Sequence, residues 1–272
     1  MKFHFNFLKT AAVVFSLLFA FGTASAQSST SPTLKRIAKS QTLKVGMTAS
    51  QAPFSMKNRD GKTIGMDVDL ANLLAASMGV ELEIVEMPFA ELLDAVEGGD
   101  VDIVLSGMTA TLERNMRVAF VGPYYLSGMS ILTTSSTLAK VNNPAELNVA
   151  NIRLAAMKGT TSEQFVKEIL AEATLTSTRD HAAAVALLRE GKVGAVIADA
   201  PTVALTVLRN PDAGFVGSQP LTLEPIGIAV APGDALMLNL VSNYMDALTA
   251  TGAQEALIKK WFGDASWMAQ VP

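Results

Sequence analysis

From residue 43 onward, hydrophobic and polar positions follow two alternating periods. Apolar residues at every second position, or in short continuous runs, predict strands, whereas spacings of three and four predict helices. The predicted strands are Leu43–Met47, Val80–Ile84, Val101–Leu105, Ile152–Met157, Val193–Ile197 and Ile226–Val230. The predicted helices are Asp69–Met78, Phe89–Val96, 161–171, His181–Glu190, one opened by Pro201, Ala235–Thr249 and Ala253–Trp261. This alternation indicates an α/β fold with a largely parallel sheet, and the segment Ser50–Gly61 is predicted to be a loop.

Two segments of the chain are similar to each other. Residues 96–107 and 188–199 each combine a helix end, a glycine stop and a buried strand, which suggests two α/β lobes built alike. On this overlay, Gly107 and Asp199 each follow the carboxyl end of a buried strand. Ligands bind at such ends in open α/β sheets, so the two positions can face each other across a cleft.

The first residues have the pattern of an export signal. A basic start with Lys2 and Lys9 precedes an apolar run, Ala11–Phe21, and a small-residue cleavage pattern that ends at Ala26. We therefore expect a signal peptide over residues 1–26, cleaved after Ala26; the alternative is an uncleaved N-terminal anchor. Loss of the two lysines changes the net charge from −4 to −6.

Composition excludes several classes of protein. The chain has no cysteine, which excludes disulfide scaffolds, thiolate metal sites, a cysteine nucleophile and a lipid-modified cysteine anchor. Only 17% of the residues are charged and acids are in excess, so no nucleic-acid partner is expected. His181 is the only histidine after the signal, and no metal, phosphate-loop or dinucleotide motif is present. We expect no catalytic residues, no metal and no cofactor.

Arg114 is the candidate cation at the first strand end. It follows Ser106, Gly107 and Thr109, and Thr111 is a suitable N-cap for a helix that carries Arg114 in its first turn. An arginine there opposes the helix dipole, and a bound planar carboxylate would compensate for that cost. A solvated surface arginine is the alternative.

Asp199 is the candidate anion at the second strand end. It can bind a cation, or it can cap the helix that follows. The segment Gly159-Thr160-Thr161 follows a strand and starts a helix, so its backbone N–H groups can bind an anion.

Taken together, these segments resemble a family. The chain is similar to the periplasmic solute-binding proteins of amino-acid ABC transporters, in the polar amino-acid group with the type II two-lobe fold. The resemblance rests on segments that occur in order, namely 43–46, 52–54, 60–62 with 64–71, 106–109 with 111–114, 123–125, 159–163, 198–199 and 224–229.

The resemblance implies roles for the candidate residues. Arg114 would bind the α-carboxylate of an amino acid, together with Thr109 and backbone groups near Gly107. Thr161 would bind the carboxylate from the second lobe through its N–H, and Asp199 would bind the α-ammonium. Lobe 1 would comprise residues 27–126 and 226–272, and lobe 2 residues 127–225, with hinges near 126–128 and 223–226.

The sequence departs from the family at two positions. Thr48 stands where many relatives have an aspartate that serves cationic side chains, and Gln51 stands where an aromatic residue commonly stacks on the ligand. Phe89 and Phe54 remain as pocket-lining candidates, and Gln51 either bonds a polar side chain or fills space. The departures favour a neutral ligand over a cationic one.

The implied function is periplasmic binding of a free amino acid in the interlobe cleft and its delivery to an inner-membrane ABC permease, by a monomer that is not an enzyme. One alternative is a dehydratase acting on prephenate or arogenate, for which Glu224 and Glu163 are the candidate general acids. The other is a ligand-sensing binding protein that docks on a receptor.

Overall fold

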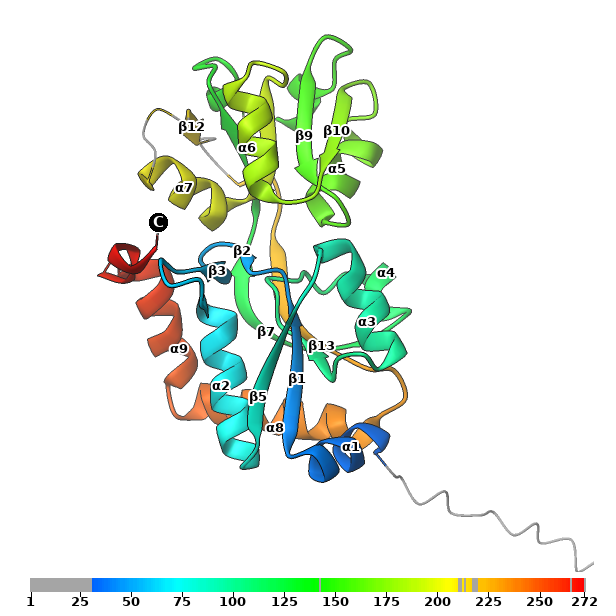
Figure 1. Ribbon diagram of the computed structural model, residues 1–272. Coiled ribbons are helices and arrows are strands. Elements are labelled where there is room, and N and C mark those ends of the chain that lie inside the picture. The colour runs from blue at the N-terminus through cyan, green and yellow to red at the C-terminus, as the bar shows by residue number, and fades with distance from the viewer. Residues whose placement is uncertain are drawn as a thin grey trace, which may run out of the picture.

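The computed structural model describes residues 31–141, 143–209, 212, 214–216, 220–264 and 266–271. The predicted signal peptide lies outside these residues. Two five-stranded sheets form separate lobes, which stand one above the other in Figure 1. Among the described residues, no helix is both long and apolar enough to span a membrane.

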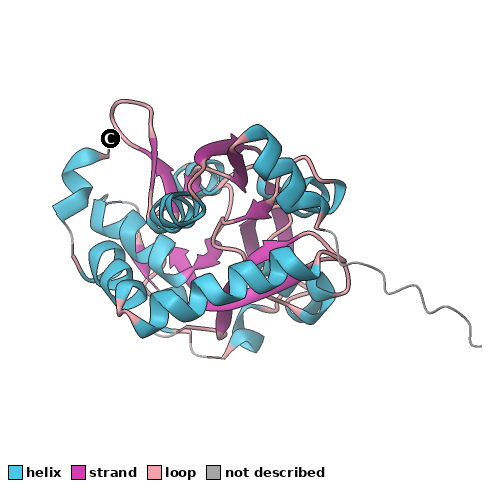
Figure 2. Cartoon of the chain, turned by 90° about the horizontal axis from the view of Figure 1, so that it is seen from below, coloured by secondary structure: helices cyan, strands magenta, loops and turns pink. Residues whose placement is uncertain are grey.

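Lobe 1 is built on a sheet with the strand order β5-β1-β6-β13-β7. Its strands are β1 (Thr42–Met47), β5 (Glu81–Glu86), β6 (Ile103–Val104), β7 (Ala119–Ser127) and β13 (Glu224–Val230). Its helices are α1 (Pro32–Ser40), α2 (Met66–Met78), α3 (Leu92–Gly98), α4 (Leu112–Asn115), α8 (Ala235–Ala250) and α9 (Ala253–Ile258). Two apolar clusters cover this sheet, and Figure 2 shows the helices arranged outside the strands.

Lobe 2 has a second sheet with the strand order β10-β9-β11-β8-β12. Its strands are β8 (Met129–Thr133), β9 (Arg153–Met157), β10 (Thr174–Thr178), β11 (Ala195–Asp199) and β12 (Phe215–Val216). Its helices are α5 (Thr161–Ile169), α6 (His181–Arg189) and α7 (Ala200–Arg209). The chain passes between the lobes from β7 to β8 and again into β13 (Figure 1).

The alternation of strands and helices is confirmed, but the sheets are mixed. In lobe 1, β1 pairs in parallel with β5 and β6, whereas β13 pairs antiparallel with both β6 and β7. The long strand β7 was not predicted, because Gly122-Pro123 interrupts its apolar pattern. The prediction of a largely parallel sheet is therefore too simple: each lobe also contains a strand that connects it to the other.

Two local predictions were wrong. The segment 50–61, predicted to be a loop, contains β2 (Ser50–Gln51) and β3 (Ser55–Lys57), which form a small antiparallel sheet with β4 (Thr63–Ile64). Strands of two or three residues are too short to produce a periodic pattern. The spacing of Leu70, Leu73 and Leu74 also predicts that all three lie on the core face of their helix, but Leu73 is 41% exposed and Ala71 is buried instead.

Candidate functional site

Arg114 lies where lobe 1 meets lobe 2. Its helix is capped by Thr111, whose hydroxyl accepts the Arg114 N–H at 3.1 Å. The buried guanidinium donates from Nη1 to the carbonyl of Thr109 at 2.8 Å and from Nη2 to the carbonyl of Gly159 in lobe 2 at 2.9 Å. Its carbon lies 5.5 Å from the ring centre of Phe89. Since a guanidinium carries five N–H donors, further donors remain for a planar anion.

Asp199 faces lobe 1 from the end of β11. Its carboxylate accepts a hydrogen bond from Nε2 of Gln51 at 2.5 Å. Burial raises the pKa of Asp199 to about 7, and the nearby charge of Glu224 adds to this rise, whereas Gln51 and Arg114 oppose it. A carboxyl with this pKa lacks a full positive counter-charge, and an ammonium group would supply one.

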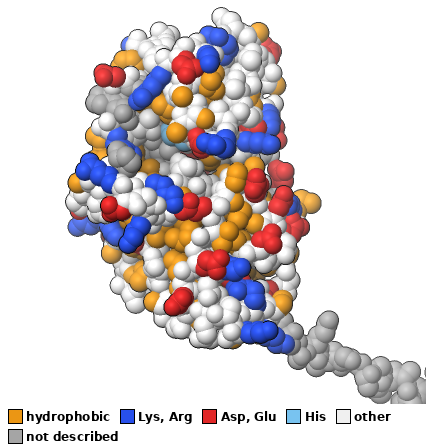
Figure 3. Space-filling model, in the orientation of Figure 1, with side chains coloured by type: hydrophobic (Ala, Val, Ile, Leu, Met, Phe, Trp, Pro, Cys, Tyr) orange, Lys and Arg blue, Asp and Glu red, His pale blue; other side chains and the backbone are white. Residues whose placement is uncertain are grey.

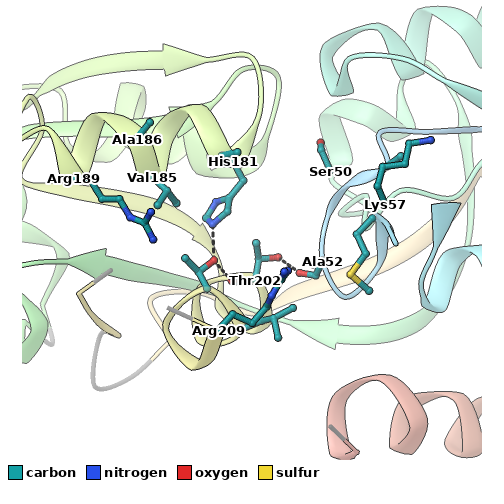
Figure 4. A pocket seen from close by; sticks show the side chains of 14 residues that line it. Ser50, Ala52, Lys57, His181, Val185, Ala186, Arg189, Thr202 and Arg209 are labelled. Atoms are coloured by element: carbon teal, nitrogen blue, oxygen red, sulfur yellow. Dashed lines mark hydrogen bonds between the residues drawn. The ribbon is translucent and has the colours of Figure 1, made fainter. Parts of the chain in front are cut away.

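Hydrogen bonds across the cleft hold the lobes in a closed arrangement. Besides the Arg114–Gly159 and Gln51–Asp199 bonds, the Thr202 hydroxyl donates to the carbonyl of Ala52 at 2.8 Å, which Figure 4 shows. Gln164 of lobe 2 donates to the Glu113 carboxylate at 2.8 Å. Lobe 1 residues 51–52 and 113–114 therefore contact the second lobe directly.

Several cavities between described residues follow the boundary between the lobes, and three of them lie near the candidate residues. The smallest, about 20 Å³, is lined by both Gln51 and Asp199. A cavity of about 380 Å³ opens on the Arg114 side, where Phe89 and Thr160 also line it. A third, about 440 Å³, lies beyond His181 and Thr202 (Figure 4). Figure 3 shows lysine and arginine side chains on both sides of the hollow between the lobes. Because sites for small molecules are usually several hundred Å³, a ligand between Gln51 and Asp199 must separate these two side chains.

Thr160 and Thr161 form the N-terminus of α5 in lobe 2. The hydroxyl of Thr160 accepts the Glu163 N–H at 3.2 Å and donates to the Met157 carbonyl at 2.6 Å. The first N–H groups of a helix lack intrahelical partners, so the N–H of Thr161 is available to an anion. Gly159, directly before them, is the residue whose carbonyl accepts from Arg114. The candidate cation of lobe 1 thus lies beside the candidate anion-binding backbone of lobe 2.

Three of the predicted site residues lie behind the cleft. The N–H of Gly107 donates into lobe 1, to Asp67 at 2.8 Å and to the Tyr124 hydroxyl at 3.2 Å. Ser106 accepts the N–H of Thr48 at 3.1 Å. Phe54 is fully buried against Tyr125 and Phe262, in edge-to-face contacts. These residues support the wall of the cleft.

Gly107 has a steric role that follows from its backbone. Its φ of +56° favours glycine, and a Cβ at this position would lie 3.1 Å from the Gln51 amide nitrogen and 3.1 Å from the Phe54 ring. The glycine therefore permits Gln51 to lie against the loop and reach Asp199.

Sequence reasoning missed Asp67 and Tyr124 as site residues. Tyr124 donates to Asp67 at 2.7 Å, and burial raises the pKa of Asp67 to about 7. Both residues lie in segments that carried the family resemblance, but nothing in their spacing indicates that they meet. Their shared bond to Gly107 fixes the loop from which Thr109 and Arg114 follow.

His181 and Glu163 have structural roles. Nε2 of His181 lies 2.9 Å from the Thr206 hydroxyl, and burial lowers the pKa of His181 to about 4. Glu163 accepts the N–H of Gly159 at 2.8 Å and also bonds Ser177 and Lys167. Burial alone would raise the pKa of Glu163, but these hydrogen bonds and the charge of Lys167 together lower it below its ordinary value.

The raised pKa of Asp199 predicts that acidification favours lobe closure. Opening exposes the carboxyl, whose pKa then returns to its ordinary value of 3.8. The closed form therefore binds the proton more tightly, and its population relative to the open form rises as pH falls through 7. Between pH 8.5 and 6.5, the ratio of closed to open ligand-free protein should rise about fourfold. If opening also exposes His181, whose pKa would then return to 6.5, its protonation favours the open form and reduces this rise to about twofold.

Fluorescence energy transfer between dyes on the two lobes would measure this ratio. Asp199→Asn, which removes this titrating group, is the matched control and should abolish the rise in the closed form. An unchanged pH response in this variant would show that another group is responsible.

The chain matches the family model for bacterial extracellular solute-binding proteins, family 3, over residues 43–264. It is 30% identical to the L-arginine-binding protein of Pseudomonas aeruginosa, a match that covers 84% of this chain and 91% of the relative. It is 27% identical to the ABC transporter glutamine-binding protein GlnH of Bacillus subtilis, over 84% of each chain.

Two further similarities concern an enzyme and its lineage. The cyclohexadienyl dehydratase of Pseudomonas aeruginosa is 26% identical over 84% of this chain and 85% of the enzyme. A crystal structure of the ancestral amino acid-binding protein AncCDT-1, described as a precursor of cyclohexadienyl dehydratase, superposes with a TM-score of 0.78. It is 36% identical and covers 85% of this chain and 99% of the ancestral one.

Proposed function

The chain belongs to the bacterial extracellular solute-binding proteins of family 3, and from this premise we propose that it binds a free amino acid between its lobes and delivers it to an ABC importer. The observation that carries the proposal is the pair of opposite charges on the two sides of one cleft. Arg114 comes from lobe 1 and Asp199 from lobe 2. An amino-acid zwitterion offers one carboxylate and one ammonium, which match these two groups.

The same geometry gives a mechanism for signalling occupancy to a permease. A ligand that contacts both lobes stabilises the closed form relative to the open one. Gln51 donates to Asp199 across the cleft, so we propose that the ammonium of a bound amino acid replaces this amide as the donor. The α-carboxylate would then bind the free N–H groups of Arg114 and the N–H of Thr161.

The proposed location is the periplasm, after cleavage of the signal peptide behind Ala26. The lobes we propose are residues 27–126 with 226–272, and residues 127–225. The docking partner in this proposal is an inner-membrane permease; a receptor would be an alternative partner for the same closed form.

We propose that the chain is a binding protein and not an enzyme, although one relative is named as a dehydratase. Glu163 is a poor general acid, because its bonds lower its pKa. Glu224 is buried at the hinge and is held by Thr222 through one oxygen. We expect no turnover of prephenate or arogenate. Measurable release of carbon dioxide from either compound would instead support the enzyme hypothesis.

The sequence-based preference for a neutral ligand rests on Thr48, which stands where many relatives have an aspartate. The relatives include proteins named for arginine and for glutamine, so the charge of the ligand side chain is a separate question. That preference considered only the charged residues near the end of β1. Glu224 at the hinge is a further carboxylate, which it did not consider.

A thermal-shift screen of the twenty amino acids tests the proposed function. A ligand that binds only the folded state raises the Tm. At a hundred times its Kd, it adds about 2.7 kcal/mol to the free energy of unfolding. We expect at least one free amino acid to raise the Tm, and acetate and methylamine, which each carry one of the two charges, to have no effect. If no amino acid shifts the transition, the proposal fails.

A further inference from the structure

Ser127 and Glu224 lie opposite each other on the two strands that connect the lobes. They are direct partners in the antiparallel pair of β7 and β13, so their side chains lie on the same face. The neighbouring residues Leu126 and Leu223 are 58% and 74% exposed, on the opposite face. Ser127 and Glu224 are only 7% and 5% exposed. At this point of the hinge the buried side chains are thus polar, while the exposed ones are apolar.

The Glu224 carboxylate is held through one oxygen only. The Thr222 hydroxyl oxygen accepts the Met129 N–H at 3.1 Å, so its proton is free to bond Oε1 of Glu224 at 3.0 Å. The second oxygen, Oε2, is buried and has no hydrogen-bond partner among the described residues. The Ser127 hydroxyl is also buried without such a partner. A fixed carboxylate with one bare oxygen is costly unless something donates to it.

The charge of Glu224 acts on both candidate ligand-binding groups. Burial lowers the pKa of Arg114, and Glu224 is the strongest of the charges that oppose this shift. Burial raises the pKa of Asp199, and the charge of Glu224 is the largest electrostatic contribution that raises it further. The carboxylate therefore lies close enough to the cleft for both groups to respond to it.

The count of charges points to the chemistry of the ligand. Arg114 contributes one positive charge, whereas Asp199 and Glu224 contribute two negative charges. A zwitterion is neutral overall, so its carboxylate and ammonium leave one buried negative charge uncompensated. A second cationic group on the ligand would compensate it, because buried charges are stable only when paired.

We propose that Glu224, with the Ser127 hydroxyl beside it, is the subsite for the positively charged side chain of a cationic amino acid. The inference rests on the proposed function and makes it more specific. It reverses the sequence-based preference for a neutral ligand, since the anion that Thr48 fails to supply from β1 comes from the hinge strand β13. Gln51 Oε1, which is also buried without a partner among the described residues, offers a further acceptor.

Matched ligands of equal shape test the charge directly in the wild-type protein. Citrulline is the neutral counterpart of arginine, and norleucine is ornithine with a methyl group in place of its ammonium. By calorimetry, we expect the cationic member of at least one pair to bind about 10- to 100-fold more tightly. Equal or tighter binding of the neutral members would overturn the proposal.

The variant Glu224→Gln should remove this preference while the protein stays folded. The side chains are nearly isosteric, so we expect the cationic ligand to lose about 10- to 100-fold in affinity and the neutral ligand to lose little. Glu83→Gln, an exposed glutamate of β5 that changes net charge equally, is the control and should leave both affinities unchanged.

Two other outcomes contradict the subsite. If Glu224→Gln weakens cationic and neutral ligands equally, Glu224 acts on the backbone ammonium and not on the side chain. If wild-type protein binds amino acids with no dependence on side-chain charge, the subsite fails but the proposed function stands. If no amino acid binds at all, the proposed function itself fails.

Discussion

Replacing Arg114 by alanine should abolish amino-acid binding at ordinary concentrations. Removal of one partner from a buried, hydrogen-bonded charge pair costs about 2–5 kcal/mol, or roughly 30- to 5,000-fold in Kd. The guanidinium combines three features that a small side chain cannot replace: a charge, free N–H donors and contact with the Phe89 ring. Calorimetry with the amino acid that gives the largest thermal shift measures the loss.

Two companion variants separate the causes of that loss. Arg114→Lys keeps the charge but not the planar donor array, so its affinity should fall between wild type and Arg114→Ala. Arg117→Ala is the control, because this arginine pairs with Asp94 and Glu97 on the surface. Thermal unfolding should show that the variants remain folded. Normal binding by a folded Arg114→Ala protein would remove Arg114 from the site.

Asp199→Asn should move affinity and stability in opposite directions. Loss of the carboxylate charge leaves the ligand ammonium without its counter-ion, which we expect to weaken binding by about 2–5 kcal/mol. In the ligand-free protein, the same change removes a buried charge that Glu224 repels, so the Tm should stay equal or rise. Calorimetry and thermal unfolding measure the two effects.

Asp100→Asn is the matched control, since Asp100 is an exposed aspartate of lobe 1. It should change neither affinity nor Tm. A folded Asp199→Asn protein with wild-type affinity would show that the ammonium binds elsewhere, with Glu224 as the nearest alternative anion. A large fall in its Tm would instead indicate a mainly structural role for Asp199.

The positions of Arg114 and Asp199 were predictable because they depend on local rules. Each follows a buried strand, and ligands of α/β sheets bind at such strand ends. The internal similarity of residues 96–107 and 188–199 placed the two ends in equivalent positions of two lobes. The structure adds the contacts across the cleft, from Arg114 to Gly159 and from Gln51 to Asp199.

The family resemblance indicated hinges near 126–128 and 223–226, but the pairing of residues within the hinge could not be predicted. Glu224 begins a strand whose partner, β7, is interrupted by a glycine and a proline, so sequence pattern gave no pairing between them. Only that pairing shows that Ser127 and Glu224 share a face. The support of Gly107 by Asp67 and Tyr124 was hidden for the same reason, since it depends on contacts between residues 40 and 57 positions apart.

The most direct test of the account is a crystal structure of the protein with its tightest-binding amino acid. We expect the ligand carboxylate to lie against the Arg114 guanidinium and the Thr161 N–H, and the ammonium against Asp199, with the Gln51 amide displaced from that carboxylate. A ligand in the opposite orientation, or one bound in the cavity beyond His181 and Thr202 without contact to Arg114 and Asp199, would contradict this arrangement.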